Sequence, residues 1–321
     1  LGAGLLLKGL LGLVAPAGAI FFYLLATRRL FAVSHWRERQ LLPTLAIATG
    51  IGVLIAAPWY VAATLANPPY FDLTLKSGEG VFRGFFWRYF SNEHLLRYLG
   101  QRLPKDYDTV PLVPFWLLHI VWLFPWSFYL PAGLQRLGGE RFSAEHRAGR
   151  VRLMALCWAL FLLVFFSFST SQEYYTMPIY PALALLIGAG VAGHGEDAPP
   201  RRWITAATAS IGVILSLAAV ACLALLLHAW SLPAEGDISN ALVANPDAYT
   251  LSLGHMSDLT LASFAYLRKP LALAALAFLI GAAGCAAHLL RQRKHRDNPA
   301  HWSAGPPWLA FAVMMILFTN A

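Results

Sequence analysis

The sequence predicts an all-α polytopic membrane protein, and three observations support this fold class. Of the 321 residues, 58% are hydrophobic and only 12% are charged, whereas soluble domains carry about 25% charged residues. Apolar runs of about 18 or more residues recur along the chain, and each is long enough to span a bilayer as a helix. These runs are continuously apolar and rich in Leu and Ala, whereas the strands of a membrane β-barrel would alternate at every second residue.

Eight apolar stretches are candidate transmembrane helices, and together they predict one transmembrane helical domain over residues 1–321. They lie at about Leu5–Leu25, Leu41–Ala66, Val110–Gly133, Leu153–Phe168, Pro178–Val191, Ile204–Trp230, Leu271–Leu290 and Pro306–Thr319. The fourth and fifth stretches are short. The segment Ser167–Thr176 between them therefore has two interpretations, a break within the membrane or a full loop.

Basic residues predict which side of the membrane each loop faces, because cytoplasmic loops are enriched in Lys and Arg. Alternate loops hold 15 of the 24 basic residues, at 26–40, 134–152, 192–203 and 291–302. These loops are predicted to be cytoplasmic, and the long segments at 67–109 and 231–269 to face outward. The charge of +8 then reflects loops that face anionic lipid, so nucleic acid is not expected as a partner.

The segment Asn67–Thr109 is the most informative part of the chain, because this long loop holds ten aromatic residues and six Lys or Arg. Disordered segments are poor in aromatics, and long loops in compact proteins are often functional. Within it, Val81–Gly100 spaces its aromatic residues along one helix face. Ser91 is predicted to be the N-cap of a second helix, on which Glu93 and Arg97 would pair. We predict an amphipathic cap that lies in the membrane interface over a site.

Side chains of this loop are candidates for binding a phosphate group, because the planar fork of Arg bonds two oxygens at once. The candidates in the loop are Arg83, Arg88, Glu93, His94, Arg97 and Lys105. The alternative interpretation is that the basic residues bind ordinary anionic lipid headgroups. The loop carries six basic and five acidic residues, and this near balance favours a site over a polybasic anchor.

Lys8 is the only Lys, Arg, Asp or Glu well inside an apolar stretch. A charge at such a position costs at least ~2.5 kcal/mol on insertion scales and usually faces a cavity. We predict that the Lys8 ammonium lies against a lipid-linked phosphate; the alternative is that it snorkels to the interface. Glu173, Tyr174 and Tyr175 are predicted at the outer surface, where Glu173 would bind a sugar hydroxyl or cap a helix.

Other conspicuous residues are expected to have structural roles. A single histidine within an apolar helix, such as His119, is more often a hydrogen-bonded packing residue than a catalyst. Trp59 and Tyr60 lie near a helix end, where Trp and Tyr form an interfacial belt. The three cysteines have no metal-ligand spacing and are expected to be small core residues. They are Cys157, Cys222 and Cys285.

Short motifs in a fixed order resemble one protein family. They are Lys8-Gly9, Arg28-Arg29, Pro58-Trp59-Tyr60, Glu93-His94-Leu95-Leu96-Arg97-Tyr98, Phe124-Pro125-Trp126, and Ser171-Gln172-Glu173-Tyr174-Tyr175 ahead of Tyr180-Pro181-Ala182-Leu183-Ala184-Leu185. Over most of residues 1–190 the chain resembles bacterial glycosyltransferases of family 39, the protein-mannosyltransferase type. The best-known relatives in this family transfer aminoarabinose to lipid A, and the chain resembles them.

The resemblance implies a GT-C helical bundle in the bacterial inner membrane. Such enzymes move a hexosyl or pentosyl group from a polyprenyl-phosphate carrier to a lipid or protein acceptor at the periplasmic face. The resemblance places Lys8 and the loop arginines near the carrier phosphate, and it gives His94 a role in organising the structure or a divalent metal. Many relatives have Ser-Lys-Leu-Pro where this chain has Ser171–Tyr174, so no lysine contact with the phosphate is expected at this segment.

The resemblance also implies that the chain is the C-terminal two-thirds fragment of such an enzyme, without the outer domain that many relatives carry. The catalytic Asp of the family lies in an outer loop that would precede Leu1, so no catalytic residue is assigned and the fragment is expected to be inactive alone. The alternative function is a multi-span transporter or lipid flippase. Transporters often contain internal repeats, however, and the sequence shows none. A non-enzymatic scaffold would leave the aromatic loop unexplained.

Overall fold

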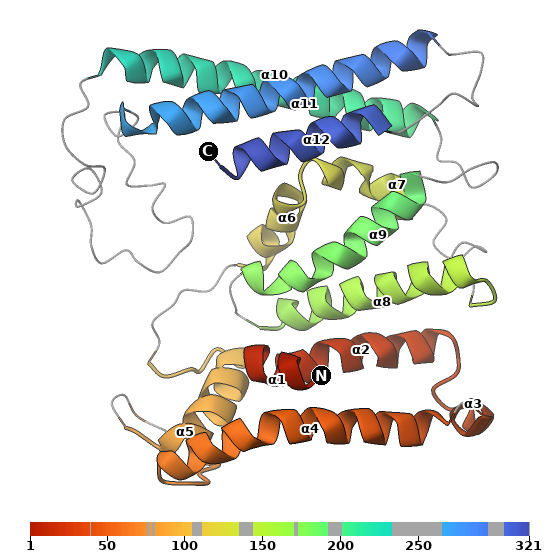
Figure 1. Cartoon of the computed structure of the whole chain (residues 1–321), viewed down its shortest axis with the longest axis vertical. Coiled ribbons are helices and arrows are strands. Elements are labelled where there is room, and N and C mark those ends of the chain that lie inside the picture. The colour runs from red at the N-terminus through yellow and green to blue at the C-terminus, as the bar shows by residue number, and fades with distance from the viewer. Residues whose placement is uncertain are drawn as a thin grey trace. The chain divides into compact units, whose positions relative to one another are not determined.

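The computed structural model describes residues 1–38, 40–75, 78, 81–104, 111–134, 144–169, 173–191, 201–232, 265–294 and 305–320. The described residues form helices and connecting turns, and they contain no strand. The predicted all-α class is therefore confirmed. The chain divides into two compact units (Figure 1): Leu1–Trp122 with Arg136–Leu186, and Leu123–Gln135 with Ile187–Ala321.

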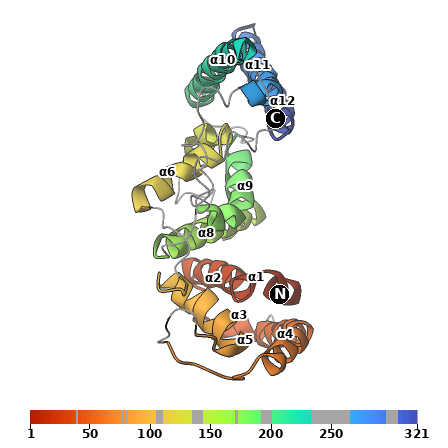
Figure 2. The same ribbon diagram turned by 90° about the vertical axis from the view of Figure 1, so that its left-hand side faces the viewer.

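The first unit contains the cap and the helices around it. Its elements are α1 (Gly2–Lys8), α2 (Leu11–Ala26), α3 (Val33–Glu38), α4 (Leu41–Ala66), α5 (Gly84–Phe86), η1 (Trp87–Leu96), α6 (Leu112–Trp122), α8 (Arg147–Ser167), η4 (Glu173–Ile179) and the start of α9 (Tyr180–Val191). Helix α1 packs against α4, and α2 packs against α8 (Figure 2). The largest side chains of its core include Leu162 on α8 and Ile179 at the end of η4.

The second unit is built around three helices that pack side by side. Its elements are η2 (Trp126–Tyr129), α7 (Leu130–Leu134), α10 (Arg201–Ser231), α11 (Arg268–Lys294) and α12 (Gly305–Phe318). Helix α11 packs against both α10 and α12. Gly281 allows this packing, because a Cβ at that position would collide with Leu215 and Met314. Two buried hydroxyls of the unit are paired, those of Tyr129 and Thr208, which lie 2.8 Å apart.

Several of these helices have the length and composition of membrane spans, so the chain is a multi-pass membrane protein. Four of the described helices are each long and apolar enough to cross a membrane. They are Leu41–Ala66, Arg147–Ser167, Arg202–Ser231 and Ala265–Lys294. A fifth span is formed if Leu112–Trp122 and Trp126–Ala132 are taken as one broken span, and three shorter apolar helices accompany them. Large apolar side chains on α4 are exposed, as with Leu54 at 74%. Lipid is a suitable solvent for such a surface.

The predicted spans all coincide with helices, and α4 has the predicted bounds. Two spans were predicted wrongly as continuous. The stretch Val110–Gly133 is bent by 95° between Trp122 and Trp126, and the stretch Leu5–Leu25 is broken between Lys8 and Leu11. The cause of the break after Lys8 is Gly9, whose φ of 61° lies outside the right-handed helical region and suits glycine. Helix α2 resumes directly after this break.

The cap also differs from the prediction in one respect. Ser91 was expected to be the N-cap of a second helix, but η1 is a single π-helix that runs through Ser91. The prediction was wrong because Ser91 is buried within the helix and its neighbours continue the backbone hydrogen bonding. The cysteines follow the expectation in part: Cys157 and Cys285 are buried, and Cys222 is half-buried.

Candidate functional site

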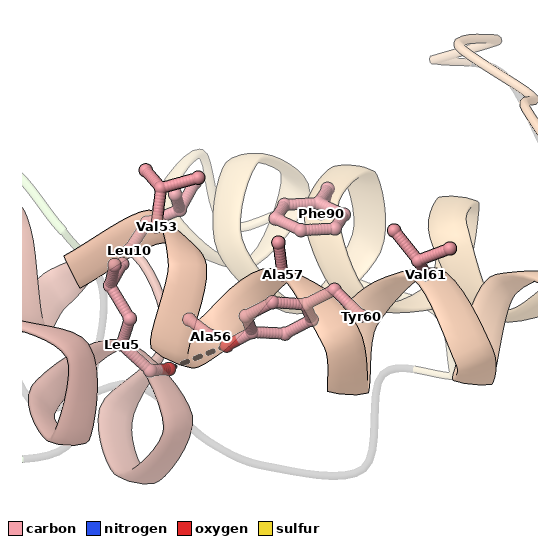
Figure 3. Close-up of a pocket in the computed structure, with 8 residues that line it drawn as sticks. All are labelled: Leu5, Leu10, Val53, Ala56, Ala57, Tyr60, Val61 and Phe90. Carbon is pink, nitrogen blue, oxygen red and sulfur yellow. Dashed lines mark hydrogen bonds between the residues drawn. The ribbon is translucent and has the colours of Figure 1, made fainter. Parts of the chain in front are cut away.

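The break between α1 and α2 is held by side chains that come from other elements. A helix end in apolar surroundings needs partners for its free backbone groups. The Leu10 N–H donates to Nε2 of His94 at 3.2 Å. The Leu5 carbonyl accepts from the Tyr60 hydroxyl at 2.5 Å, as the dashed line in Figure 3 shows. Helix α4 and the cap therefore both fix the backbone on either side of Lys8.

An aromatic cluster joins the cap to this break. The hydroxyls of Tyr60 and Tyr89 lie 3.0 Å apart. Nδ1 of His94 lies 2.6 Å from the Tyr89 carbonyl, so it carries the proton and donates, and Nε2 accepts. Burial, together with the hydrogen bond to Tyr60, raises the pKa of Tyr89, and its hydroxyl therefore stays protonated. Through this cluster η1 is bonded to α4 and to the break.

An apolar pocket of about 230 Å³ lies beside this cluster. Figure 3 shows its lining side chains around the Tyr60 ring. They are Leu5, Leu10, Val53, Ala56, Ala57, Tyr60, Val61 and Phe90. The volume is below the ~300–1,000 Å³ of typical small-molecule sites. The pocket is therefore suited to a short piece of hydrocarbon rather than to a whole ligand.

A second polar cluster lies on the cap around Glu93. The Glu93 carboxylate accepts from Arg97 at 2.9 Å and from Arg102 at 2.8 Å. The predicted pair of Glu93 and Arg97 is therefore confirmed. The Arg97 guanidinium also lies over the ring of Tyr175, 5.3 Å from its centroid, in a cation–π arrangement. Arg97 thus has a fixed orientation between the cap and η4.

Further contacts attach this part of the cap to its surroundings. The Tyr98 hydroxyl donates to the Phe165 carbonyl of α8 at 3.2 Å. The Asn92 side chain accepts from the Leu103 N–H at 2.9 Å and donates to the carbonyl of the same residue at 2.5 Å. Asn92 is buried. These bonds restrict the cap on both sides of Glu93.

Two loop arginines lie apart from these clusters. Arg83 donates to the Asp72 carboxylate at 2.8 Å. Hydrogen bonds from Thr74, followed by the one from Arg83, lower the pKa of Asp72 to about 2, so this pair is ionised at neutral pH. Arg88 is exposed.

The predicted site residues are brought together only in part. His94 meets the backbone next to Lys8, and Arg97 meets Glu93 and Tyr175. The Lys8 side chain is exposed, and the apolar pocket is lined by none of the predicted cations. Lys105 lies outside the described residues, as do the side chains of two η4 residues, Glu173 and Tyr174.

Sequence reasoning missed several residues that the structure places in these clusters. Tyr60 was interpreted as part of an interfacial belt, yet its hydroxyl bonds the Leu5 carbonyl. Arg102 lies nine residues after Glu93, a separation that matches no helical repeat. Tyr89 was read only as part of an aromatic face. The sequence feature that could have pointed to Tyr60 was its place in the family motif Pro58-Trp59-Tyr60.

The metal role implied for His94 does not fit the residues present. Both ring nitrogens of His94 are engaged, with the Leu10 N–H and the Tyr89 carbonyl. Among the residues that the structure describes, no group of three or more His, Cys, Asp or Glu is placed to hold a metal ion. His94 is a structural link between the cap and the helix break.

Comparison with known proteins identifies relatives of one kind, although no family model matches the chain. The chain is 30% identical over 244 residues to the undecaprenyl phosphate-alpha-4-amino-4-deoxy-L-arabinose arabinosyl transferase of Pectobacterium carotovorum, covering 73% of this chain and 37% of that protein. It is 31% identical over 229 residues to the transferase of the same name from Pseudomonas paraeruginosa, covering 70% and 35%. The chain thus spans less than half the length of the curated relatives that it matches.

A solved structure shows that the fold is shared as well. The crystal structure of ArnT from Cupriavidus metallidurans, bound to undecaprenyl phosphate, superposes with a TM-score of 0.60 at 20% identity. The match covers 98% of this chain and 46% of that protein. The family resemblance of the motifs is therefore confirmed, and this chain is a homologue of the aminoarabinose transferases with their GT-C fold.

Proposed function

We propose that the protein transfers a sugar from a polyprenyl-phosphate carrier to a lipid or protein acceptor. We place it in the bacterial inner membrane, with the aromatic cap on the periplasmic side. The observation that carries the proposal is the fixed guanidinium of Arg97, held between Glu93 and the Tyr175 ring. Such an oriented cation suits the phosphate of a carrier. The names of the relatives, which specify an undecaprenyl phosphate-linked sugar, support the same substrate class.

The chemistry assigns distinct tasks to the groups in such a site. A hydroxyl or amine of the acceptor attacks the anomeric carbon of the sugar, and the bond from that carbon to the phosphate oxygen breaks. The departing phosphate keeps the electron pair, and a carboxylate takes the proton of the acceptor. Arg97 and Lys8 stabilise the charge that grows on the phosphate. We assign no residue of this chain as the base.

The apolar pocket gives this proposal a place for the carrier's hydrocarbon. It adjoins the helix break that carries Lys8, and its lining includes Leu5 and Leu10 on either side of that break. We propose that the first isoprene units next to the phosphate lie in it, with the phosphate toward Lys8. Contacts of Arg83, Arg88, Lys105, Glu173 and Tyr174 with the carrier or sugar remain predictions.

A transfer assay separates this function from transport. Vesicles that contain the full-length protein would be incubated with a radiolabelled polyprenyl-phosphate sugar and an acceptor lipid. Label on the acceptor is the expected result. Label that crosses the vesicle membrane on an unchanged carrier would instead indicate a transporter or flippase.

The variant Lys8→Ala is expected to bind undecaprenyl phosphate about tenfold more weakly, because a charge-assisted contact contributes ~1.5–3 kcal/mol. Titration of the purified protein in detergent with undecaprenyl phosphate measures this affinity. Lys8→Arg should recover most of it. Lys294→Ala, which removes an exposed charge at the end of α11, is the control. Unchanged affinity in Lys8→Ala would remove Lys8 from the site.

A further inference from the structure

His119 and Thr176 form a buried polar pair that the proposed chemistry does not use. His119 on α6 is 7% exposed and Thr176 on η4 is 0% exposed. Nε2 of His119 is hydrogen-bonded to the hydroxyl of Thr176. Polar groups buried among apolar helices are costly unless they are paired. A pair at this position therefore calls for a reason beyond filling space.

The ring of His119 has a defined tautomer. Its Nδ1 lies 2.6 Å from the Phe115 carbonyl, one turn back on α6. A carbonyl only accepts, so Nδ1 carries the proton and Nε2 must accept. The Thr176 hydroxyl is therefore the donor. The His119 ring is thus fixed on α6, and its Nε2 is the ring atom that accepts a hydrogen bond from η4.

Thr176 directly follows Tyr175, the residue whose ring lies under Arg97. Element η4 is a 3₁₀ helix of seven residues, and such helices are weak because their hydrogen bonds have poor geometry. Tertiary contacts must therefore set its position. The Thr176 bond fixes η4 next to Tyr175, and the Phe166 ring, 6.0 Å away, packs beside Tyr175.

We propose that His119 is a positioning residue: through the Thr176 hydroxyl it holds Tyr175 where its ring meets the Arg97 guanidinium. The link runs from α6 through η4 to the cap. The expected effect on the carrier rests on the proposed function, in which Arg97 binds the carrier phosphate. The contact between Tyr175 and Arg97 can be tested without it.

The sharpest test removes either the hydroxyl or the methyl group of Thr176. Thr176→Val keeps the shape and removes the donor, whereas Thr176→Ser keeps the donor. In the full-length protein, loss of the hydrogen bond is expected to raise KM for the polyprenyl-phosphate sugar about fivefold in Thr176→Val, with kcat within about twofold. Thr176→Ser should stay near wild type. Thr44→Val is the matched control, because the exposed Thr44 hydroxyl bonds only within its own helix, to the Gln40 carbonyl.

A readout that needs no activity follows Tyr175 directly. The protein would be labelled with 3-fluorotyrosine, and the ¹⁹F signal of Tyr175 assigned with Tyr175→Phe. The signal is expected to shift in Thr176→Val and in His119→Leu, and to stay in place in Thr176→Ser. A signal that stays in place in Thr176→Val overturns the proposal, and so does an equal response of the Val and Ser variants. If the wild type transfers no sugar while the signal shifts as expected, only the proposed function is lost.

Discussion

Replacing Gly9 by Ala is expected to lower the free energy of unfolding of the first unit by ~2–6 kcal/mol, in two parts. The backbone at Gly9 has a φ of 61° and a ψ of −144°, a combination that is essentially restricted to glycine and costs another residue ~1–3 kcal/mol. A Cβ at this position would also collide with the His94 ring and the Tyr89 hydroxyl, and such overpacking costs ~1–3 kcal/mol. The thermal midpoint, followed by tryptophan fluorescence in detergent, should fall clearly.

Gly50→Ala is the matched control for this variant. Gly50 lies in α4, and a Cβ there would meet no atom within 4 Å. Because Gly within a helix is less favourable than Ala by roughly 0.5–1 kcal/mol, Gly50→Ala should match or slightly exceed the wild type in stability. Gly9→Ala should also weaken binding of undecaprenyl phosphate, since the segment around Lys8 must shift. A Gly9→Ala protein as stable as wild type would show that His94 does not hold the break.

Replacing Glu93 by Gln is expected to lower the affinity for undecaprenyl phosphate more than tenfold, or ~1.4 kcal/mol. Glu93 orients Arg97 and Arg102 at 2.9 and 2.8 Å. A neutral amide cannot form either ion pair, and the Arg97 guanidinium would lose its fixed place over Tyr175. The three side chains are 12–25% exposed, so the cap should also lose ~1–3 kcal/mol of stability. Calorimetric titration with the lipid phosphate measures the affinity.

Asp72→Asn provides the control for Glu93→Gln. It removes another ion pair of the cap, with Arg83 at 2.8 Å, without touching Arg97. Its affinity for the carrier should stay near that of the wild type. The opposite outcome for Glu93→Gln, tighter binding, would mean that Glu93 competes with the phosphate for Arg97, and the proposed arrangement would then be wrong.

The helices could be predicted from the sequence because their signal is local. Continuous apolar runs predicted α4 with its observed bounds, and the Glu93–Arg97 pair followed from a spacing of four residues. The break at Gly9 was missed, although glycine is permissive there. The partners that make the break stable, His94 and Tyr60, lie 84 residues from Leu10 and 55 from Leu5. Only the tertiary fold brings them together.

Contacts between distant residues were also what the sequence could not predict in the candidate site. Tyr175 was a predicted site residue, but nothing in the sequence shows that its ring would meet Arg97. His119 was expected to be a hydrogen-bonded packing residue, and its bond to Thr176 confirms this. The partner could not be named, because it lies 57 residues away. At Ser91 the local signal was misleading: the residue type predicted an N-cap, but the helix η1 continues through this position.

The break between α1 and α2 also bears on how the protein responds to the thickness of its membrane. In a continuous helix, tilting to match a thinner bilayer would carry every side chain along with the rod. Here α1 ends at Lys8 and its last turn is bonded to Tyr60 of α4, while Leu10 is bonded to His94 of the cap. The break therefore separates two properties of this stretch: α4 and the cap fix the backbone around Lys8, whereas the inclination of α2 is set by its packing against α8.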